Sequence, residues 1–100
     1  MLTHTELVRA VRFMIAAEFE AIQLYEQLAE STDNEVARKV LRDITDEEKE
    51  HAGEFRHLLT LLAPGDEEHY AEGREEANNY LQPLLERARE EEITGDCGCD

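Results

Sequence analysis

The sequence predicts an all-α fold, in which an antiparallel hairpin of two long helices precedes a C-terminal helix. Two long stretches carry apolar residues at helical spacing, and a short polar turn separates them. No stretch alternates apolar and polar residues as a strand does, and no repeat of solenoid length occurs. Consecutive helices joined by a short turn pack antiparallel, so these two form a hairpin. With 100 residues, the chain makes one domain with a modest core.

The first predicted helix begins close to the N-terminus and continues to about Glu30. Thr3 or Thr5 caps it, and Glu6 lies in the first turn, where a negative charge is favourable. No Pro or Gly interrupts this run. Its apolar residues recur at helical spacing and define the face that packs in the hairpin: Val8, Val11, Ile15, Phe19, Ile22, Tyr25 and Ala29.

The second predicted helix covers about residues 34–62. The polar turn at residues 31–34 provides its cap, and Glu35 supplies an acid to its first turn. Pro64 and Gly65 end it, because neither residue continues a helix comfortably. Its apolar face consists of Val36, Val40, Ile44, Phe55, Leu58 and Leu62, with Ala37 and Ala52 beside it.

The rest of the chain divides into an acidic helix and a tail. We expect residues 1–64 to form the hairpin, residues 65–92 the C-terminal acidic helix, and residues 93–100 a flexible tail containing Cys97 and Cys99. Pro83 predicts a kink or a break in the acidic helix. Its apolar stripe is narrow and consists of Tyr70, Ala77, Leu81, Leu84 and Ala88.

The charge of the chain excludes several classes of partner. A net charge of -15 argues against nucleic acid and against an anionic membrane surface, because both require clustered Lys and Arg. It favours cations, of which metal ions are the simplest. No apolar run approaches the length of a membrane span, and residues 1–4 do not resemble the start of a secretory signal. We therefore expect residence in the cytoplasm.

Three side chains are predicted to meet on the inner face of the hairpin. Glu48 and His51 lie three residues apart, so they share one face of the second helix. Glu18 falls in the middle of the first helix's apolar face, where an ionised carboxylate is unfavourable unless it is paired or binds metal. A salt bridge to Arg12 or Arg42 is the alternative. With a turn near residue 32, Glu18 lies level with Glu48. Two further acid–histidine pairs exist, and the one formed by Glu54 and His57 is predicted to face solvent.

Glu18, Glu48 and His51 amount to half of a known kind of metal centre. A ferritin-like di-iron bundle takes one Glu from each of two helices and a Glu-x-x-His from each of the other two. A two-fold dimer of hairpins would complete the four-helix bundle and bury apolar surface that one hairpin leaves wet. One chain could instead hold a single ion with open positions, as in catalytic zinc sites. The carboxylate-rich set favours iron, with manganese or zinc as substitutes.

The segments AEFEAIQLYE (residues 17–26) and DEEKEHA (residues 46–52) resemble the encapsulated ferritins, over about residues 5–63. This resemblance implies a ferroxidase that oxidises Fe(II) to Fe(III) with dioxygen, for iron storage or detoxification, at a di-iron centre shared by a dimer. It implies Glu18, Glu48 and His51 as catalytic ligands, Tyr25 as a neighbour that hydrogen-bonds near the metal, and Glu20, which faces outward, on the path of incoming iron. It also implies a decameric ring of dimers delivered into an encapsulin nanocompartment.

Several alternatives remain open on the sequence. The tail, DCGCD at residues 96–100, differs from the apolar, Leu-containing peptide that docks free-standing cargo to the shell, so encapsulation is not settled. Two cysteines alone do not build the cysteine-rich iron domain of a rubrerythrin-like peroxidase, which ranks as the weaker enzyme hypothesis. The rival from another class is a non-catalytic acidic helical module that binds metal weakly or binds a partner.

Overall fold

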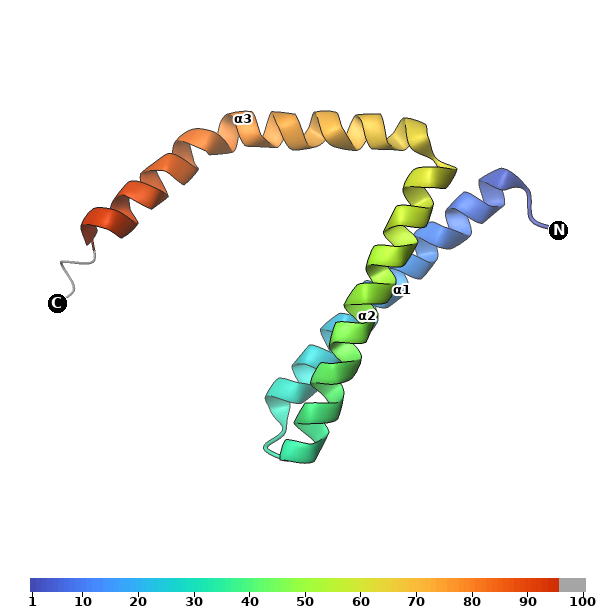
Figure 1. Cartoon of the computed structure of the whole chain (residues 1–100), viewed down its shortest axis with the longest axis horizontal. Helices are drawn as coiled ribbons and strands as arrows, with labels where there is room; N and C mark the ends of the chain where they lie inside the picture. Colours follow the sequence, from blue (N-terminus) through green and yellow to red (C-terminus); the bar gives the residue numbers. More distant parts are fainter. Residues whose placement is uncertain (96–100) are drawn as a thin grey trace. The chain divides into compact units, whose positions relative to one another are not determined.

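The computed structural model describes the backbone of residues 1–95 and the side chains of residues 1–92. It contains three helices, α1 (His4–Ser31), α2 (Glu35–Leu62) and α3 (Pro64–Gly95), which Figure 1 labels in order. The predicted all-α fold and the predicted hairpin of the first two helices are therefore confirmed. None of the helices in the described part is both long and apolar enough to span a membrane.

α1 begins with a reciprocal pair of hydrogen bonds around Thr3. The Glu6 backbone N–H donates to Thr3 Oγ1 over 3.1 Å, and the Thr3 backbone N–H donates to Glu6 Oε1 over 2.9 Å. These bonds satisfy two donors that a helix start otherwise leaves without partners. Of the two predicted caps, Thr3 is therefore the one used.

A turn of three residues connects α1 to α2 and is held by side chains from both ends. Asn34 caps α2, with its Oδ1 accepting a hydrogen bond of 2.9 Å from the backbone N–H of Ala37. Arg38 Nε donates to the carbonyl oxygen of Thr32, the residue that caps the C-terminus of α1, over 2.6 Å. At the open end of the hairpin, His4 Nε2 lies 2.8 Å from the carbonyl oxygen of Leu62. The register of the two helices is thus fastened at both ends.

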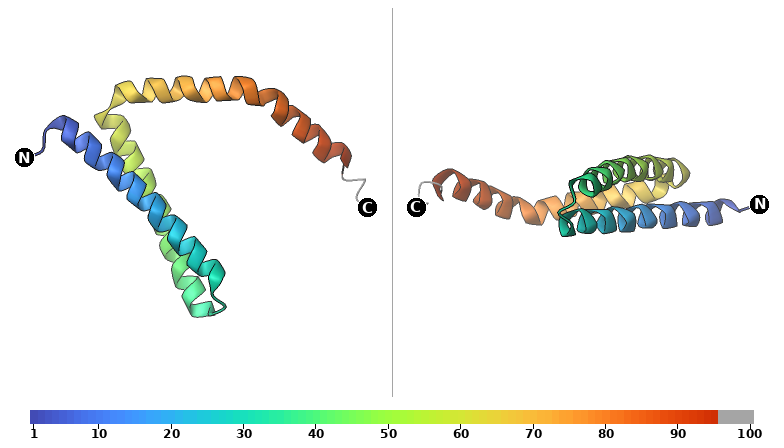
Figure 2. Two further views of the ribbon diagram at one scale, coloured as in Figure 1. Left: turned by 180° about the vertical axis from the view of Figure 1, so that it is seen from behind. Right: turned by 90° about the horizontal axis from the view of Figure 1, so that it is seen from below.

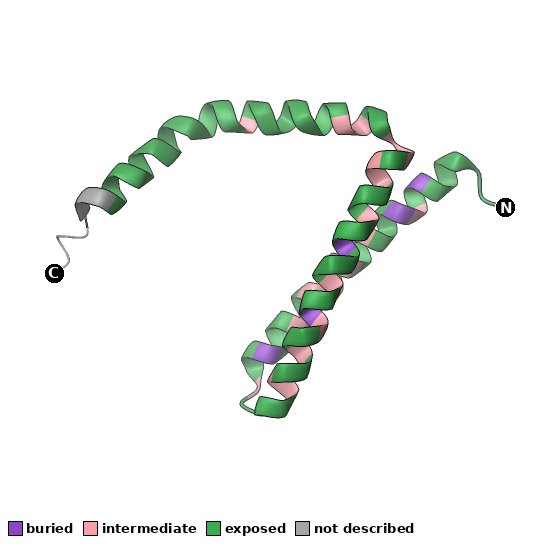
Figure 3. Ribbon diagram, in the orientation of Figure 1, coloured by how far each residue is buried: buried purple, intermediate pink, exposed green. Residues whose placement is uncertain are grey.

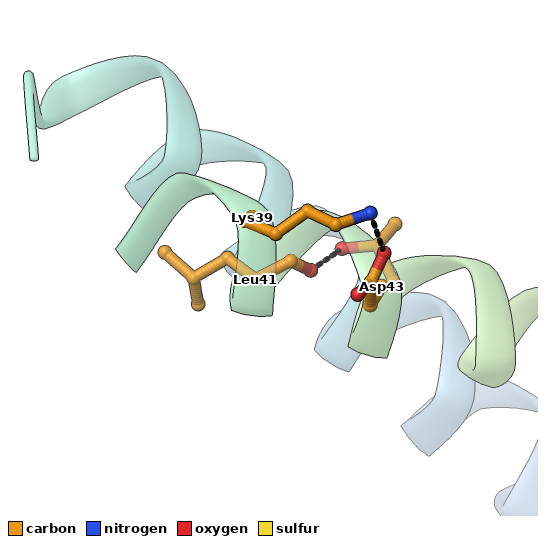
Figure 4. Close-up of polar contacts among 4 residues, drawn as sticks. Lys39, Leu41 and Asp43 are labelled. Carbon is orange, nitrogen blue, oxygen red and sulfur yellow. Dashed lines mark hydrogen bonds and ion pairs between the residues drawn. The ribbon is translucent and has the colours of Figure 1, made fainter. Parts of the chain in front are cut away.

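α1 and α2 lie side by side and antiparallel in all views (Figures 1 and 2). Their shared core is thin, and Figure 3 shows the buried positions as isolated patches along the contact line. The buried residues are small or medium in size: Val8, Val11, Ala29, Thr45 and Ala52. Thr45 is the buried polar residue in the described part of the chain, and its Oγ1 donates to the Leu41 carbonyl over 2.7 Å, so burial leaves its hydroxyl satisfied. Figure 4 shows the exposed Lys39–Asp43 ion pair of 3.1 Å.

The apolar faces predicted from the sequence are wider than the core that the structure forms. Phe19, Val36 and Val40 were placed on those faces, but each is more than half exposed. Two helices cover only the narrow stripe along their line of contact, and residues further around each helix have nothing to pack against. The hairpin therefore displays more large apolar side chains than a self-sufficient domain of this size usually does.

α3 belongs to a second compact unit, which begins at Gly65. It starts at Pro64, immediately after the cap of α2, because Pro is accommodated in the first turn of a helix, where its missing N–H leaves no bond unmade. The helix continues through Pro83, although its axis bends in the C-terminal half that contains this residue (Figures 1 and 2). It extends to Gly95, three residues past the expected boundary at 92. The predicted cysteines, Cys97 and Cys99, lie outside the described residues.

Candidate metal centre

The structure brings together the three side chains that the sequence singled out. Glu18 comes from the middle of α1, and Glu48 and His51 come from successive turns of α2. Each offers one ligand atom, and these atoms all lie within 4.8 Å of one another. It is the one such cluster of three or more His, Cys, Asp or Glu side chains among the described residues. A single ion placed among them could contact both helices.

The residues of the cluster differ in exposure, from the interior of the hairpin to its surface. Glu48 and His51 are one turn apart, with Glu48 Oε2 3.8 Å from His51 Nδ1. The Glu48 side chain is 21% exposed, whereas that of His51 is 50% exposed. The carboxylates are therefore held between the helices, and the imidazole borders the solvent. A ligand bound here would be reached from the side on which His51 lies.

Glu18 provides the test of whether these residues fit a metal ion. Its Oε2 atom is buried and makes no hydrogen bond within the described part of the chain. A buried carboxylate oxygen without a partner is unfavourable, and native proteins rarely tolerate one without a functional reason. A cation among Glu18, Glu48 and His51 would satisfy this oxygen. The two carboxylates and one imidazole also form a donor set that suits iron, manganese or zinc.

The two long sides of the hairpin differ in character. Winding each helix at about 100° per residue from the line of contact puts His51 on the same side as an apolar stripe from each helix. We call this the site side, and it comprises Met14, Ala21 and Leu28 of α1 with Val40, His51 and Leu58 of α2. Met14, Leu28, Val40 and Leu58 are all exposed there. The metal cluster thus opens onto an uncovered apolar surface.

The opposite side, which we call the charged side, carries ionised residues such as Glu26 and Lys49, and it also exposes Phe19. Lys49 Nζ lies 3.7 Å from Glu26 Oε2, so an ion pair links the two helices. A hollow of about 280 Å³ adjoins this pair, and Ala29 and Thr45 lie at its base. The Glu26–Lys49 pair was not predicted from the sequence, because the two residues are not level along the hairpin. Helical side chains lean toward the N-terminus of their own helix, and this lean brings the two antiparallel residues together.

The other residues named from the sequence take separate places. Tyr25 is half-buried on α1, two turns after Glu18. Glu20 is exposed and lines a shallow hollow of about 500 Å³ on the outer surface of α1. Glu54 and His57 are exposed, as predicted, and do not join the cluster.

Comparison with known proteins identifies the family. The chain matches the Rubrerythrin family over residues 7–95. It belongs to the rubrerythrin family. The crystal structure of the encapsulated ferritin domain from Pyrococcus furiosus is similar, with a TM-score of 0.76 and 42% sequence identity, over 79% of this chain and 81% of that one. The resemblance to encapsulated ferritins is therefore confirmed for this rubrerythrin-family chain.

Two curated proteins extend the comparison. The encapsulin nanocompartment cargo protein EncC of Myxococcus xanthus is 43% identical over 74 residues, which are 74% of this chain and 57% of that protein. The ferritin-like-encapsulin shell fusion protein of Pyrococcus furiosus is 48% identical over 62 residues, which are 62% of this chain and 18% of that protein. This rubrerythrin-family chain therefore spans about half, or less, of the length of these relatives.

Proposed function

We propose that this protein is a ferroxidase that oxidises Fe(II) to Fe(III) with dioxygen, at a di-iron centre completed by two copies of the chain. The observation that carries the proposal is the convergence of Glu18, Glu48 and His51, with a buried Glu18 oxygen that lacks a partner. The family and its encapsulated-ferritin members support iron as the metal. Iron storage or detoxification is the physiological role we assign to this reaction.

In this reaction iron is the substrate, and the protein supplies the side chains that would hold two iron ions close together. Each Fe(II) gives up one electron, so two irons held together reduce one dioxygen by two electrons, and two protons from solvent complete hydrogen peroxide. Glu18 and Glu48 provide negative charge that offsets the positive charge of the ions and favours the ferric state. His51 provides a neutral nitrogen at the open edge. Three protein ligands leave coordination positions free for dioxygen and water.

A second copy of the chain is required because one hairpin supplies half of the ligands. A di-iron bundle uses four carboxylates and two histidines, and each copy contributes two carboxylates and one histidine. Pairing through the site side would bring two clusters together about a two-fold axis and cover the exposed apolar residues there. The unpaired Glu18 oxygen would then face a metal rather than an empty apolar contact.

The further roles form part of the same proposal. Tyr25 hydrogen-bonds near the ligands, and the exposed Glu20 attracts incoming iron. Residues 1–64 carry the catalytic hairpin, and residues 65–92 form a helix for assembly into a ring of dimers. The names of the two curated relatives connect them to encapsulin shells, and we propose an encapsulin nanocompartment as the location of this chain.

The test uses the metal-free protein under air. Fe(II) is added, oxygen uptake is recorded, and the mass of the assembly and the iron content per chain are measured. We expect iron-dependent uptake and about one iron per chain, which is two per dimer. Glu18→Gln should lower the uptake to the rate of the same Fe(II) without protein and remove the bound iron. Glu30→Gln, which removes an exposed acid of α1 on the charged side, should leave both intact. Parent-like uptake by Glu18→Gln, or a monomer that binds no stoichiometric iron, would contradict the proposal and favour the non-catalytic partner-binding module.

A further inference from the structure

Met14 lies close to Glu18 in the sequence of α1. It precedes Glu18 by one helical turn, and residues at this spacing have Cβ atoms about 6 Å apart. It lies on the site side, and in the register that pairs Glu18 with Glu48 it is level with Ala52, beside His51. Its side chain is half exposed. Met14 therefore lies one helical turn from Glu18, on the side of the hairpin where the metal cluster opens.

The chain has two methionines, and the second provides an internal comparison. Met1 is fully exposed at the N-terminus, well before the start of the cluster. An oxidant in bulk solvent attacks methionines roughly according to their exposure, so it should prefer Met1. An oxidant generated within the cluster starts one helical turn from Met14 but more than four turns from Met1, so it should prefer Met14. The ratio of oxidation at the two residues thus reports where the oxidant comes from.

We propose that Met14 is an oxidative modification site, at which hydrogen peroxide formed at the iron centre converts the thioether to the sulfoxide, and that the sulfoxide weakens the pairing of the two copies. This inference depends on the proposed function, which supplies the peroxide. It adds a limit on turnover to the activity, because a chain that releases peroxide into its own interface progressively loses the partner that completes its site.

The chemistry is balanced and needs no further reagent. A lone pair on Met14 Sδ attacks one oxygen of hydrogen peroxide, and the O–O bond breaks as the S–O bond forms. The departing hydroxide takes up the proton of the transferred hydroxyl, and water leaves. Sulfur loses two electrons, and the peroxide gains them. The product is a polar, chiral group in place of a flexible apolar one. On an apolar interface such a group needs hydrogen-bond partners, which the site-side stripes do not offer.

The first experiment locates the oxidant. Cys97 and Cys99 are alkylated so that their thiols do not consume peroxide, and Fe(II) is added in successive portions under air with catalase in solution. Oxygen uptake is recorded, and peptide mass spectrometry measures sulfoxide at Met14 and Met1. Catalase removes peroxide that has escaped, so we expect several-fold more sulfoxide at Met14 than at Met1. In a parallel sample, hydrogen peroxide added to the metal-free protein should oxidise Met1 at least as much as Met14.

The second experiment tests the consequence with Met14→Leu, which keeps the apolar volume but cannot form a sulfoxide. Over successive additions of iron, the parent should lose a growing share of its first-addition rate, and its oxidised fraction should shift toward the mass of a single chain. Met14→Leu should retain its own first-addition rate and its assembly mass.

The outcomes separate this inference from the proposed function. If oxygen uptake depends on iron but Met14 is oxidised no more than Met1, the modification site is wrong and the ferroxidase stands. If Met14 is oxidised selectively but the oxidised chains remain paired, the effect on pairing is wrong. If no iron-dependent uptake occurs, the ferroxidase itself fails, and Met14 loses its source of oxidant.

Discussion

Glu18 and His51 lie on different helices and 33 residues apart in the sequence, yet their ligand atoms approach within 4.8 Å. The contact joins the buried middle of α1 to the half-exposed edge of α2. It therefore depends on the register of the whole hairpin, which side chains at the turn and at the open end hold in place. The same contact places an unsatisfied carboxylate oxygen in a thin apolar core.

The first prediction is that Glu18 destabilises the metal-free fold but is required for iron oxidation. Replacing it by Gln keeps its shape and removes the negative charge from a buried oxygen that has no partner. In the metal-free protein, we expect Glu18→Gln to raise the free energy of unfolding by about 1–3 kcal/mol, because burying an unpaired charge costs more than burying a neutral amide. Urea unfolding at equal protein concentration measures the change, and iron-dependent oxygen uptake should be lost in the same variant.

Glu30→Gln is the matched control, because Glu30 is an exposed acid on the same helix. It should change the free energy of unfolding by no more than about 0.5 kcal/mol, as is usual for surface substitutions. Its oxygen uptake should equal that of the parent. Equal effects of the two substitutions on metal-free stability would show that Glu18 carries no special strain, and the argument from its unpaired oxygen would fail.

The second prediction concerns the site side as the surface of pairing. Leu28 and Gln27 are neighbours on α1, both exposed, but only Leu28 lies on the site side. Leu28→Glu should reduce the assembly to single chains and lower oxygen uptake, because two charges would be buried against apolar partners. Gln27→Glu adds the same charge on the outer surface and should change neither. The assembly mass of both variants is measured. Equal masses of Leu28→Glu and Gln27→Glu would show that the copies pair through another surface.

The third prediction is a pH dependence at the start of α1. The Thr3 backbone N–H, and then the Thr3 hydroxyl, donate hydrogen bonds that lower the pKa of Glu6 below its ordinary value of 4.5. Because the folded pKa is lower than the unfolded one, this carboxylate adds stability above pH 4.5, and the contribution is lost as the pH falls through the folded pKa. Glu6→Gln removes the titration. The stability difference between parent and variant, followed by thermal unfolding, should therefore shrink on acidification, and a constant difference would contradict the assignment.

The hairpin and its cluster could be predicted because both follow from local periodicity. The spacing of Val8, Val11 and Ala29 defines the contact line of α1, and the short polar turn requires the helices to run antiparallel. With the turn near residue 32, the antiparallel arrangement then places Glu18 about level with Glu48. The role of these residues as metal ligands stays a prediction, since periodicity places side chains without revealing what they bind.

The start of α3 and the exposure of some apolar residues could not be predicted, because they depend on parts of the structure distant in the sequence. Pro64 and Gly65 were interpreted as a stop, but the same two residues form the first turn of α3, because a helix start tolerates Pro as well as a helix end does. The exposure of Phe19 and Val40 could not be foreseen from their spacing, since it depends on how many helices surround them. Apolar residues beside the line of contact have the same helical spacing as core residues, so periodicity alone does not separate the two.

The last prediction uses Gly53, an exposed glycine in the interior of α2. A Cβ at this position would meet nothing within 4 Å, and the backbone is not in the left-handed region. Gly in a helix interior is less favourable than Ala by about 1 kcal/mol. We therefore expect Gly53→Ala to raise the free energy of unfolding by about 0.5–1 kcal/mol, measured by urea unfolding of dilute, metal-free protein.

Gly65→Ala is the control, because Gly65 also has open space around it but lies in the first turn of α3, where helix propensity contributes less. The free energy of unfolding should rise less in Gly65→Ala than in Gly53→Ala.

Gly53 also tests the surface through which the copies assemble, since it lies away from the site side. If Gly53→Ala stabilises the dilute protein but weakens the oligomer formed at high concentration, another copy must approach the backbone of α2 at this residue. An unchanged oligomer would leave the outer surface of α2 free, as pairing through the site side requires.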